Sequence, residues 1–123
     1  MIITAWNNGK HHASGAGYGF RVDLVDRDRY FRREWGTAVL HLQGSLEPVV
    51  VNIDKDSFWG PVCRELISKE IGHWLSLNKM APWHKRRPPK LMMKSTGANE
   101  FDILFSKLGS SQPLNRVVGI AEF

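Results

Sequence analysis

The order of apolar and polar residues predicts a chain built mainly from short strands. The pattern is clearest over residues 18–24, where every second residue is apolar: Tyr18, Phe20, Val22 and Leu24. A period of two is typical of a strand with one face in the core. Short apolar or β-branched runs predict further strands at 2–6, 37–42, 48–53, 90–94 and 101–105, the last with Phe101, Ile103 and Phe105 toward the core.

The polar stretches between these runs predict their connections. Residues 43–47 and 95–100 have the length of hairpin loops. Residues 26–34 are polar around an aromatic pair, which favours a turn or one to two helical turns. The apolar run 116–120 fits either a closing strand or a loosely held tail.

One segment has the periodicity of a helix instead. Over residues 58–79 apolar side chains recur every three or four positions, as Trp59, Cys63, Leu66, Ile67, Ile71, Trp74 and Leu75. Such a stripe predicts one long amphipathic helix whose apolar face, Cys63 included, packs on the core. Ser57 is a suitable N-cap and Asn78 a suitable C-cap. Glu65 and Lys69 are expected to form an ion pair on the helix surface.

The order of these elements predicts the fold class. A chain of 123 residues fits one domain, and a single helix cannot provide the crossovers that a parallel sheet needs. We therefore expect an α+β domain over residues 1–105: a strongly bent antiparallel sheet or small barrel, similar in architecture to Sm, SH3 or OB folds, with the long helix inserted before the last strands. Residues 106–123 are expected to be a linker followed by a C-terminal tail or closing strand.

The cysteine count and the lack of long apolar runs limit the cellular locations to be expected for the protein. The single cysteine, Cys63, excludes an intrachain disulfide. The N-terminus lacks the apolar run of a signal peptide, and no stretch approaches the roughly 20 apolar residues of a membrane span. We expect a cytoplasmic protein with no membrane association.

Positive charge is concentrated in one part of the chain. The net charge is +5, and residues 79–94 alone carry +6, with no acidic residue among them. The other 107 residues hold 11 basic and 12 acidic residues, a balance of −1. A local excess of this kind attracts phosphates, whereas scattered charge mainly confers solubility.

This charge makes the basic segment, residues 83–94, the first candidate site. Its side chains with a predicted role are Trp83, Lys85, Arg86, Arg87, Lys90 and Lys94. The lysines and arginines would contact phosphates, and Trp83 would stack on an unpaired base. The structural alternative is a solvated loop in which Trp83 covers the end of the core.

The glycine-rich stretch at residues 7–19 is the second candidate site. Its polar side chains, Asn7, Asn8, His11, His12 and Ser14, can bind an anion or transfer a proton. It has neither the GxxxxGK pattern of a phosphate loop nor the following helix of a dinucleotide site. The structural alternative is a hairpin loop whose glycines serve turns. The histidines and Cys63 lack metal-ligand spacing, so we expect no metal and no cofactor.

Three stretches together carry a resemblance. They are Trp6-Asn7-Asn8-Gly9 with His12–Gly19, then Asp26–Phe31, and Ala81-Pro82-Trp83 with Pro88-Pro89-Lys90. In these the chain resembles a group of short uncharacterised bacterial proteins over about residues 2–105. The resemblance implies a bacterial source and a single compact domain, and it carries no activity.

Three functions follow in order of preference. The first is a non-enzymatic module that binds RNA or DNA through residues 83–94. The second is an enzyme or small-anion binder centred on residues 7–19, which requires a concave pocket where His11 or His12 meets a second polar group from elsewhere in the chain. The third is a protein-interaction module or accessory subunit, which can also form a homo-oligomer.

Overall fold

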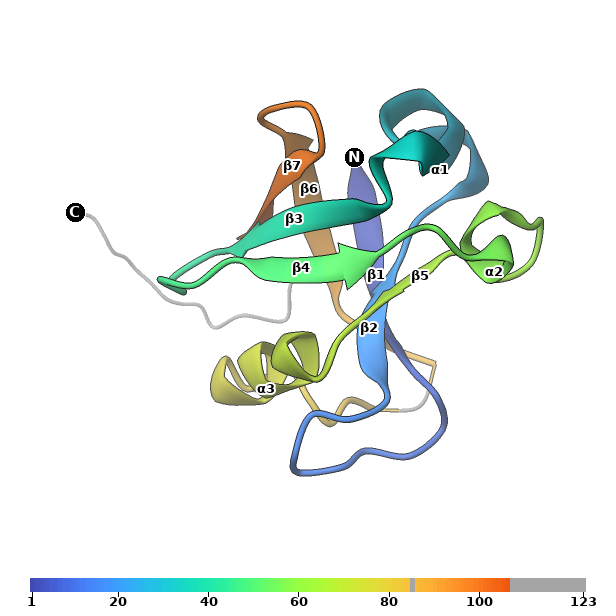
Figure 1. Cartoon of the computed structure of the whole chain (residues 1–123). Coiled ribbons are helices and arrows are strands. Elements are labelled where there is room, and N and C mark those ends of the chain that lie inside the picture. The colour runs from blue at the N-terminus through green and yellow to red at the C-terminus, as the bar shows by residue number, and fades with distance from the viewer. Residues whose placement is uncertain (85, 107–123) are drawn as a thin grey trace.

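The strands form one mixed sheet that is nearly closed into a barrel (Figure 1). The computed structural model describes residues 1–84 and 86–106. The strands are β1 (Ile2–Asn7), β2 (Tyr18–Arg21), β3 (Thr37–Leu42), β4 (Val49–Asn52), β5 (Glu65–Ile67), β6 (Lys90–Ser95) and β7 (Glu100–Phe105). Their order in the sheet is β4-β3-β7-β6-β1-β2-β5. The edge strands β4 and β5 are in contact, which brings the two edges of the sheet together. The predicted α+β barrel architecture is therefore confirmed.

The sequence predicted a wholly antiparallel sheet, and this prediction is wrong for one pair of strands. Five pairs are antiparallel, but β3 and β7 run parallel, with Leu40 opposite Phe101. A parallel pair needs a long connection between its strands. Here the connection from β3 to β7 contains β4, β5, β6 and two short helices, so no single crossover helix is required. The prediction of an antiparallel sheet failed because a parallel pair was expected only where a helix makes the crossover.

The predicted strands are present with small shifts in their ends. β3 has its predicted bounds, and the 43–47 and 95–100 hairpins both form. β2 ends at Arg21, and Leu24, expected in the core, is 41% exposed at the start of helix α1 (Leu24–Tyr30). With the 3-10 turn η1 (Arg33–Trp35), α1 confirms the predicted helical turns. Phe105, also expected in the core, is 36% exposed. Residues 116–120 lie outside the described part.

The predicted long helix over residues 58–79 is wrong. The segment contains helix α2 (Asp56–Trp59), strand β5 and helix α3 (Lys69–Leu77). Pro61 has no N–H to continue a helix, and Arg64 has a positive φ of 145°. Leu66 is instead buried opposite Phe20 of β2.

Two side-chain predictions fail with that helix. Cys63, expected in the core, is exposed in the connection between α2 and β5. Glu65, expected on the surface beside Lys69, is buried, and its carboxylate lies 3.9 Å from the Arg21 guanidinium on β2. Both errors follow from the wrong helix: Cys63 lies in the loop before β5, and within β5 Glu65 takes the face set by the two-residue period of a strand, not by the 3.6-residue period of a helix.

Helix α3 has well-defined ends. Ser68, not Ser57, caps it: the Ser68 hydroxyl accepts a hydrogen bond from the Glu70 N–H (3.2 Å). Asn78 is the C-cap, as predicted. Lys79 follows with a φ of 59°, and Met80 N–H donates to Leu75 C=O (2.8 Å), the Schellman arrangement that commonly ends a helix.

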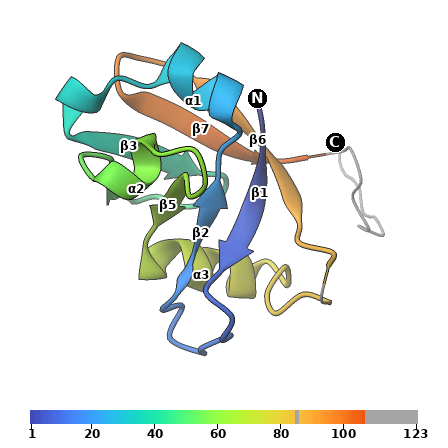
Figure 2. The same ribbon diagram turned by 90° about the vertical axis from the view of Figure 1, so that its right-hand side faces the viewer.

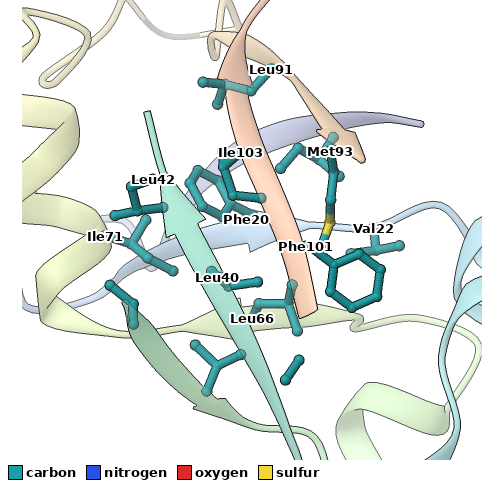
Figure 3. Packing of buried hydrophobic residues seen from close by; sticks show 14 of the residues in the cluster. Phe20, Val22, Leu40, Leu42, Leu66, Ile71, Leu91, Met93, Phe101 and Ile103 are labelled. Carbon is teal, nitrogen blue, oxygen red and sulfur yellow. The ribbon is translucent and has the colours of Figure 1, made fainter. Parts of the chain in front are cut away.

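The core fills the barrel and continues under α3 (Figure 3). Inward side chains from every strand meet there, among them Phe20, Leu40, Leu66, Met93 and Ile103, and Ile71 of α3 packs beside Leu42. Figures 1 and 2 both place α1 and α3 at opposite ends of the barrel. The glycine-rich loop between β1 and β2 (residues 8–17) and the loop that precedes β6 lie at the α3 end.

Candidate nucleic-acid interface

Strand pairing assembles a polar row on the outside of the barrel. Ile3 and Ala5 of β1 point into the core, so Thr4 and Trp6 point outward. Thr4 lies opposite Lys90 of β6 on one side and Arg21 of β2 on the other. The Lys90 ammonium donates a hydrogen bond to the Thr4 hydroxyl (3.2 Å). Two cations far apart in the sequence therefore flank one strand.

Trp6 lies on the same outer surface, next to this row. Its side chain is half-buried but does not belong to the core cluster. Its cross-strand neighbour is Gly19, which has no side chain to cover the indole. We name the outward residues of β6, β1 and β2, with the two arginines before β6, the basic face: Thr4, Trp6, Arg21, Arg86, Arg87 and Lys90.

The predicted phosphate-binding residues fall into three groups. Arg86, Arg87 and Lys90 are exposed and lie together at the start of β6. Lys94 is also exposed on β6 but lies opposite Asp102 of β7, which offsets its charge. Lys85 lies outside the described residues. The Arg87 N–H donates to the His84 C=O (2.9 Å), so a turn presents the two arginines.

The neighbours of the basic segment leave most of its charge uncompensated. Residues 1–20 contain no acidic residue, and they form β1, the glycine-rich loop and most of β2. β1 pairs with β6, so an acid-free strand borders the acid-free segment. Among the described residues, acidic cross-strand neighbours occur at the two flanks, where Glu65 lies beside Arg21 and Asp102 lies opposite Lys94.

Trp83 joins the two sites that the sequence had predicted separately. Its half-buried indole packs edge-on against His11 (5.0 Å between ring centroids) and Tyr18 (5.5 Å), and it contacts the core. The basic segment and the glycine-rich loop therefore touch. This packing agrees with the structural alternative for Trp83, because two rings and the core already cover part of the indole surface.

The polar side chains of the glycine-rich loop mostly bind the loop itself. The Asn7 amide donates to Lys10 C=O (2.7 Å) and accepts from Gly9 N–H (2.8 Å). Asn8 accepts from Lys10 N–H, and Ser14 from Ala16 N–H. His12 is exposed to solvent. These bonds hold turns rather than present free groups to a ligand.

His11 meets a second polar group, but one from its own loop, whereas the catalytic alternative required a partner from elsewhere in the chain. Its Nδ1 is hydrogen-bonded to the Tyr18 hydroxyl, and the two rings lie 5.2 Å apart. Burial raises the pKa of Tyr18 above its usual value, so the phenol stays neutral and acts as a hydrogen-bond partner. Tyr18 comes from the end of the same loop, and the ring added from elsewhere is Trp83.

Sequence reasoning missed Thr4, Trp6 and Arg21. The alternation in residues 2–6 held a signal, because its one polar residue, Thr4, marks the outward phase that Trp6 shares. Nothing local placed Arg21 or Lys90 beside Thr4, since that depends on strand register.

Two further expectations bear on chemistry and location. The described residues contain no group of three or more His, Cys, Asp or Glu side chains that can hold a metal ion. Among the helices described, none is both long and apolar enough to span a bilayer.

No protein-family model, curated protein or solved structure matches this chain.

Proposed function

We propose that the basic face binds single-stranded nucleic acid. The observation that carries the proposal is the pairing of acid-free β1 with the start of β6, which leaves Arg86, Arg87 and Lys90 without acidic neighbours on that strand. Such a patch attracts a phosphate backbone. Trp6 lies on the same face of β1 as Thr4, which is opposite Lys90, and it offers a ring for a base.

Stacking on Trp6 favours a single strand over a duplex. Bases in a duplex stack on one another, whereas unpaired bases are free to stack on an aromatic ring. Small barrels commonly bind single strands on an outer strand surface, and this likeness of architecture is an analogy only.

The catalytic alternative receives less support. It needed polar groups free to meet a substrate, but Asn7, Asn8 and Ser14 are engaged in the turns of their own loop. His11 is held by Tyr18 and Trp83.

The first test measures the charge contribution. If about five phosphates are neutralised on a single strand, log K against log salt has a slope near −3.5, because each contributes about −0.7. The double variant Arg87→Gln/Lys90→Gln should bind more weakly and reduce the slope to about −2. A matched control, Arg29→Gln/Arg32→Gln, removes the same charge from exposed residues at the α1 end and should leave binding unchanged.

The readout is fluorescence anisotropy with labelled single- and double-stranded RNA and DNA at several salt concentrations. Absence of binding at low salt would contradict the proposal. An equal loss of nucleic-acid affinity in the two double variants would contradict it as well.

The second test isolates Trp6. Base stacking on an aromatic side chain contributes about 1–3 kcal/mol, so Trp6→Ala should weaken single-strand binding by about five- to 150-fold and leave the salt slope unchanged. Trp6→Phe should recover most of the affinity, and duplex binding should change little. An equal loss of affinity for single- and double-stranded nucleic acid would show that Trp6 does not stack on a base.

A further inference from the structure

A separate groove lies between α3 and the turn that joins β3 to β4. It has a volume of about 570 Å³ and apolar walls that include Leu46, Trp74 and Leu77. Leu46 is 98% exposed and Leu77 is 70% exposed. Two large apolar side chains facing one groove are typical of a surface that another segment covers. Glu47 and Glu70 also line it.

The last strand brings the chain to this groove. β7 ends at Phe105, whose ring stacks on Trp74 with centroids 5.4 Å apart and planes 1° from parallel. The Phe105 N–H donates to the Gln43 side-chain oxygen (2.8 Å), and the Trp74 indole N–H donates to the Gln43 C=O (2.9 Å). Trp74 and Gln43 both line the groove. The chain therefore leaves the barrel at the edge of the groove.

The sequence that follows has the composition to fill it. Residues 107–123 contain six large apolar residues, two basic residues and one acidic residue: Leu108, Leu114, Val117, Val118, Ile120 and Phe123, with Lys107, Arg116 and Glu122. The basic residues complement Glu47 and Glu70. Leu114 is nine residues beyond Phe105, a reach of up to about 30 Å.

We propose that residues 107–123 bind the groove of their own chain, with apolar side chains against Leu46, Trp74 and Leu77. Attachment at Phe105 makes this a contact within one molecule, and a short tether gives an effective concentration in the millimolar range. A contact too weak to hold a free peptide is then sufficient to occupy the groove. This proposal is independent of nucleic-acid binding, because the groove shares no residue with the basic face.

Limited trypsin digestion of the full chain, followed by mass spectrometry, tests it. Trypsin cleaves after Lys107 and Arg116, and docking lowers the cleavage rate in proportion to the fraction of time that the segment is undocked. In the wild type, cleavage after Arg116 should be at least about fivefold slower than in a synthetic peptide of residues 107–123, which corresponds to about 1 kcal/mol of docking.

Two variants and a control locate the contact. Leu46→Ser/Leu77→Ser should bring cleavage to the peptide rate, because it removes exposed apolar surface from the groove. Val25→Ser/Val62→Ser changes equally exposed apolar residues outside the groove and should keep the wild-type rate. Leu114→Ser/Ile120→Ser alters only the segment and should also reach the peptide rate.

Cleavage of the wild-type chain at the peptide rate would overturn the proposal. Protection that grows with protein concentration would overturn it as well, because the occupant would then come from a second copy.

Discussion

Ser68 shows how one side chain determines where a helix begins. Its hydroxyl accepts from the Glu70 N–H and donates to the Glu70 carboxylate (2.5 Å). The second bond holds the pKa of Glu70 below its usual value. Ser57, the cap expected from the sequence, lies inside α2, which begins at Asp56 after the N-cap Lys55. The start of α3 therefore depends on Ser68.

Replacing Ser68 should lower stability in a pH-dependent way. Ser68→Ala should cost about 1 kcal/mol in the free energy of unfolding near pH 7, because it removes an N-cap. A carboxylate with a lowered pKa stabilises the fold above its unfolded pKa, and this contribution disappears as the pH falls through the folded pKa. The deficit of Ser68→Ala should therefore shrink below about pH 4.

Urea unfolding at neutral and acidic pH measures this effect. Ser57→Ala is the matched control and should change stability by less than about 0.5 kcal/mol. A deficit that is the same at both pH values would show that the Glu70 carboxylate takes no part.

At the scale of elements, two glycines fasten the glycine-rich loop to α3. Gly15 has a φ of 89°, and a β-carbon there would lie 2.2 Å from the Lys69 carbonyl oxygen. A β-carbon on Gly72 would lie 2.3 Å from the Gly15 carbonyl oxygen. Backbone meets backbone at this contact, so neither residue has room for a side chain. The glycines give the loop a docked position as well as its turns.

Gly72→Ala tests this contact. Alanine favours a helix over glycine by up to about 1 kcal/mol, but overpacking costs about 1–3 kcal/mol. Because the obstructing atom is backbone, strain should prevail, with a net loss of about 2 kcal/mol and faster hydrogen exchange in residues 8–17. Gly60→Ala is the control: its β-carbon would be 3.4 Å from the nearest atom and its φ is −81°, so stability should stay equal or rise. A wild-type exchange rate in Gly72→Ala would refute the docked loop.

At the scale of elements, strands with a local signal could be predicted from the sequence, whereas features that depend on strand pairing could not. Half-buried strands were found because alternation is a local signal, and β3 has its predicted bounds. The segment 58–79 misled because its apolar residues fit a helical stripe, while its actual structure depends on pairing with β2, more than 40 residues away. The basic segment was visible because its charges are contiguous. The basic face could not be predicted, because only the register of the paired strands brings Lys90 and Arg21 to the two sides of Thr4.

At the scale of the whole molecule, charge is unevenly distributed between the two ends of the barrel. At the α1 end, residues 23–34 contain four acidic and four basic residues. At the α3 end, residues 79–84 and 86–90 carry +4 and border acid-free β1. Like charges gathered in one place repel each other and oppose the compact state. The fold should therefore be less stable at low salt because of the surface that we propose for binding.

This cost can be measured without any ligand. Arg87→Gln/Lys90→Gln should raise the Tm at about 0.01 M salt by about 2 °C, equivalent to roughly 0.5 kcal/mol. The lost Lys90–Thr4 bond offsets little, because Lys90 is exposed and water replaces the bond. The gain should nearly vanish at 0.15 M, where the screening length has fallen from about 30 Å to about 8 Å.

Arg29→Gln/Arg32→Gln provides the contrast, because it removes the same charge from a balanced region. Its Tm at low salt should stay level or fall, since these arginines lie among acidic residues. Thermal unfolding followed by circular dichroism across the salt series distinguishes the two variants. A lower Tm for Arg87→Gln/Lys90→Gln at low salt, or a gain that persists at 0.15 M, would mean that the charges of the basic face do not repel. Its positive potential would then be too weak to attract a phosphate backbone.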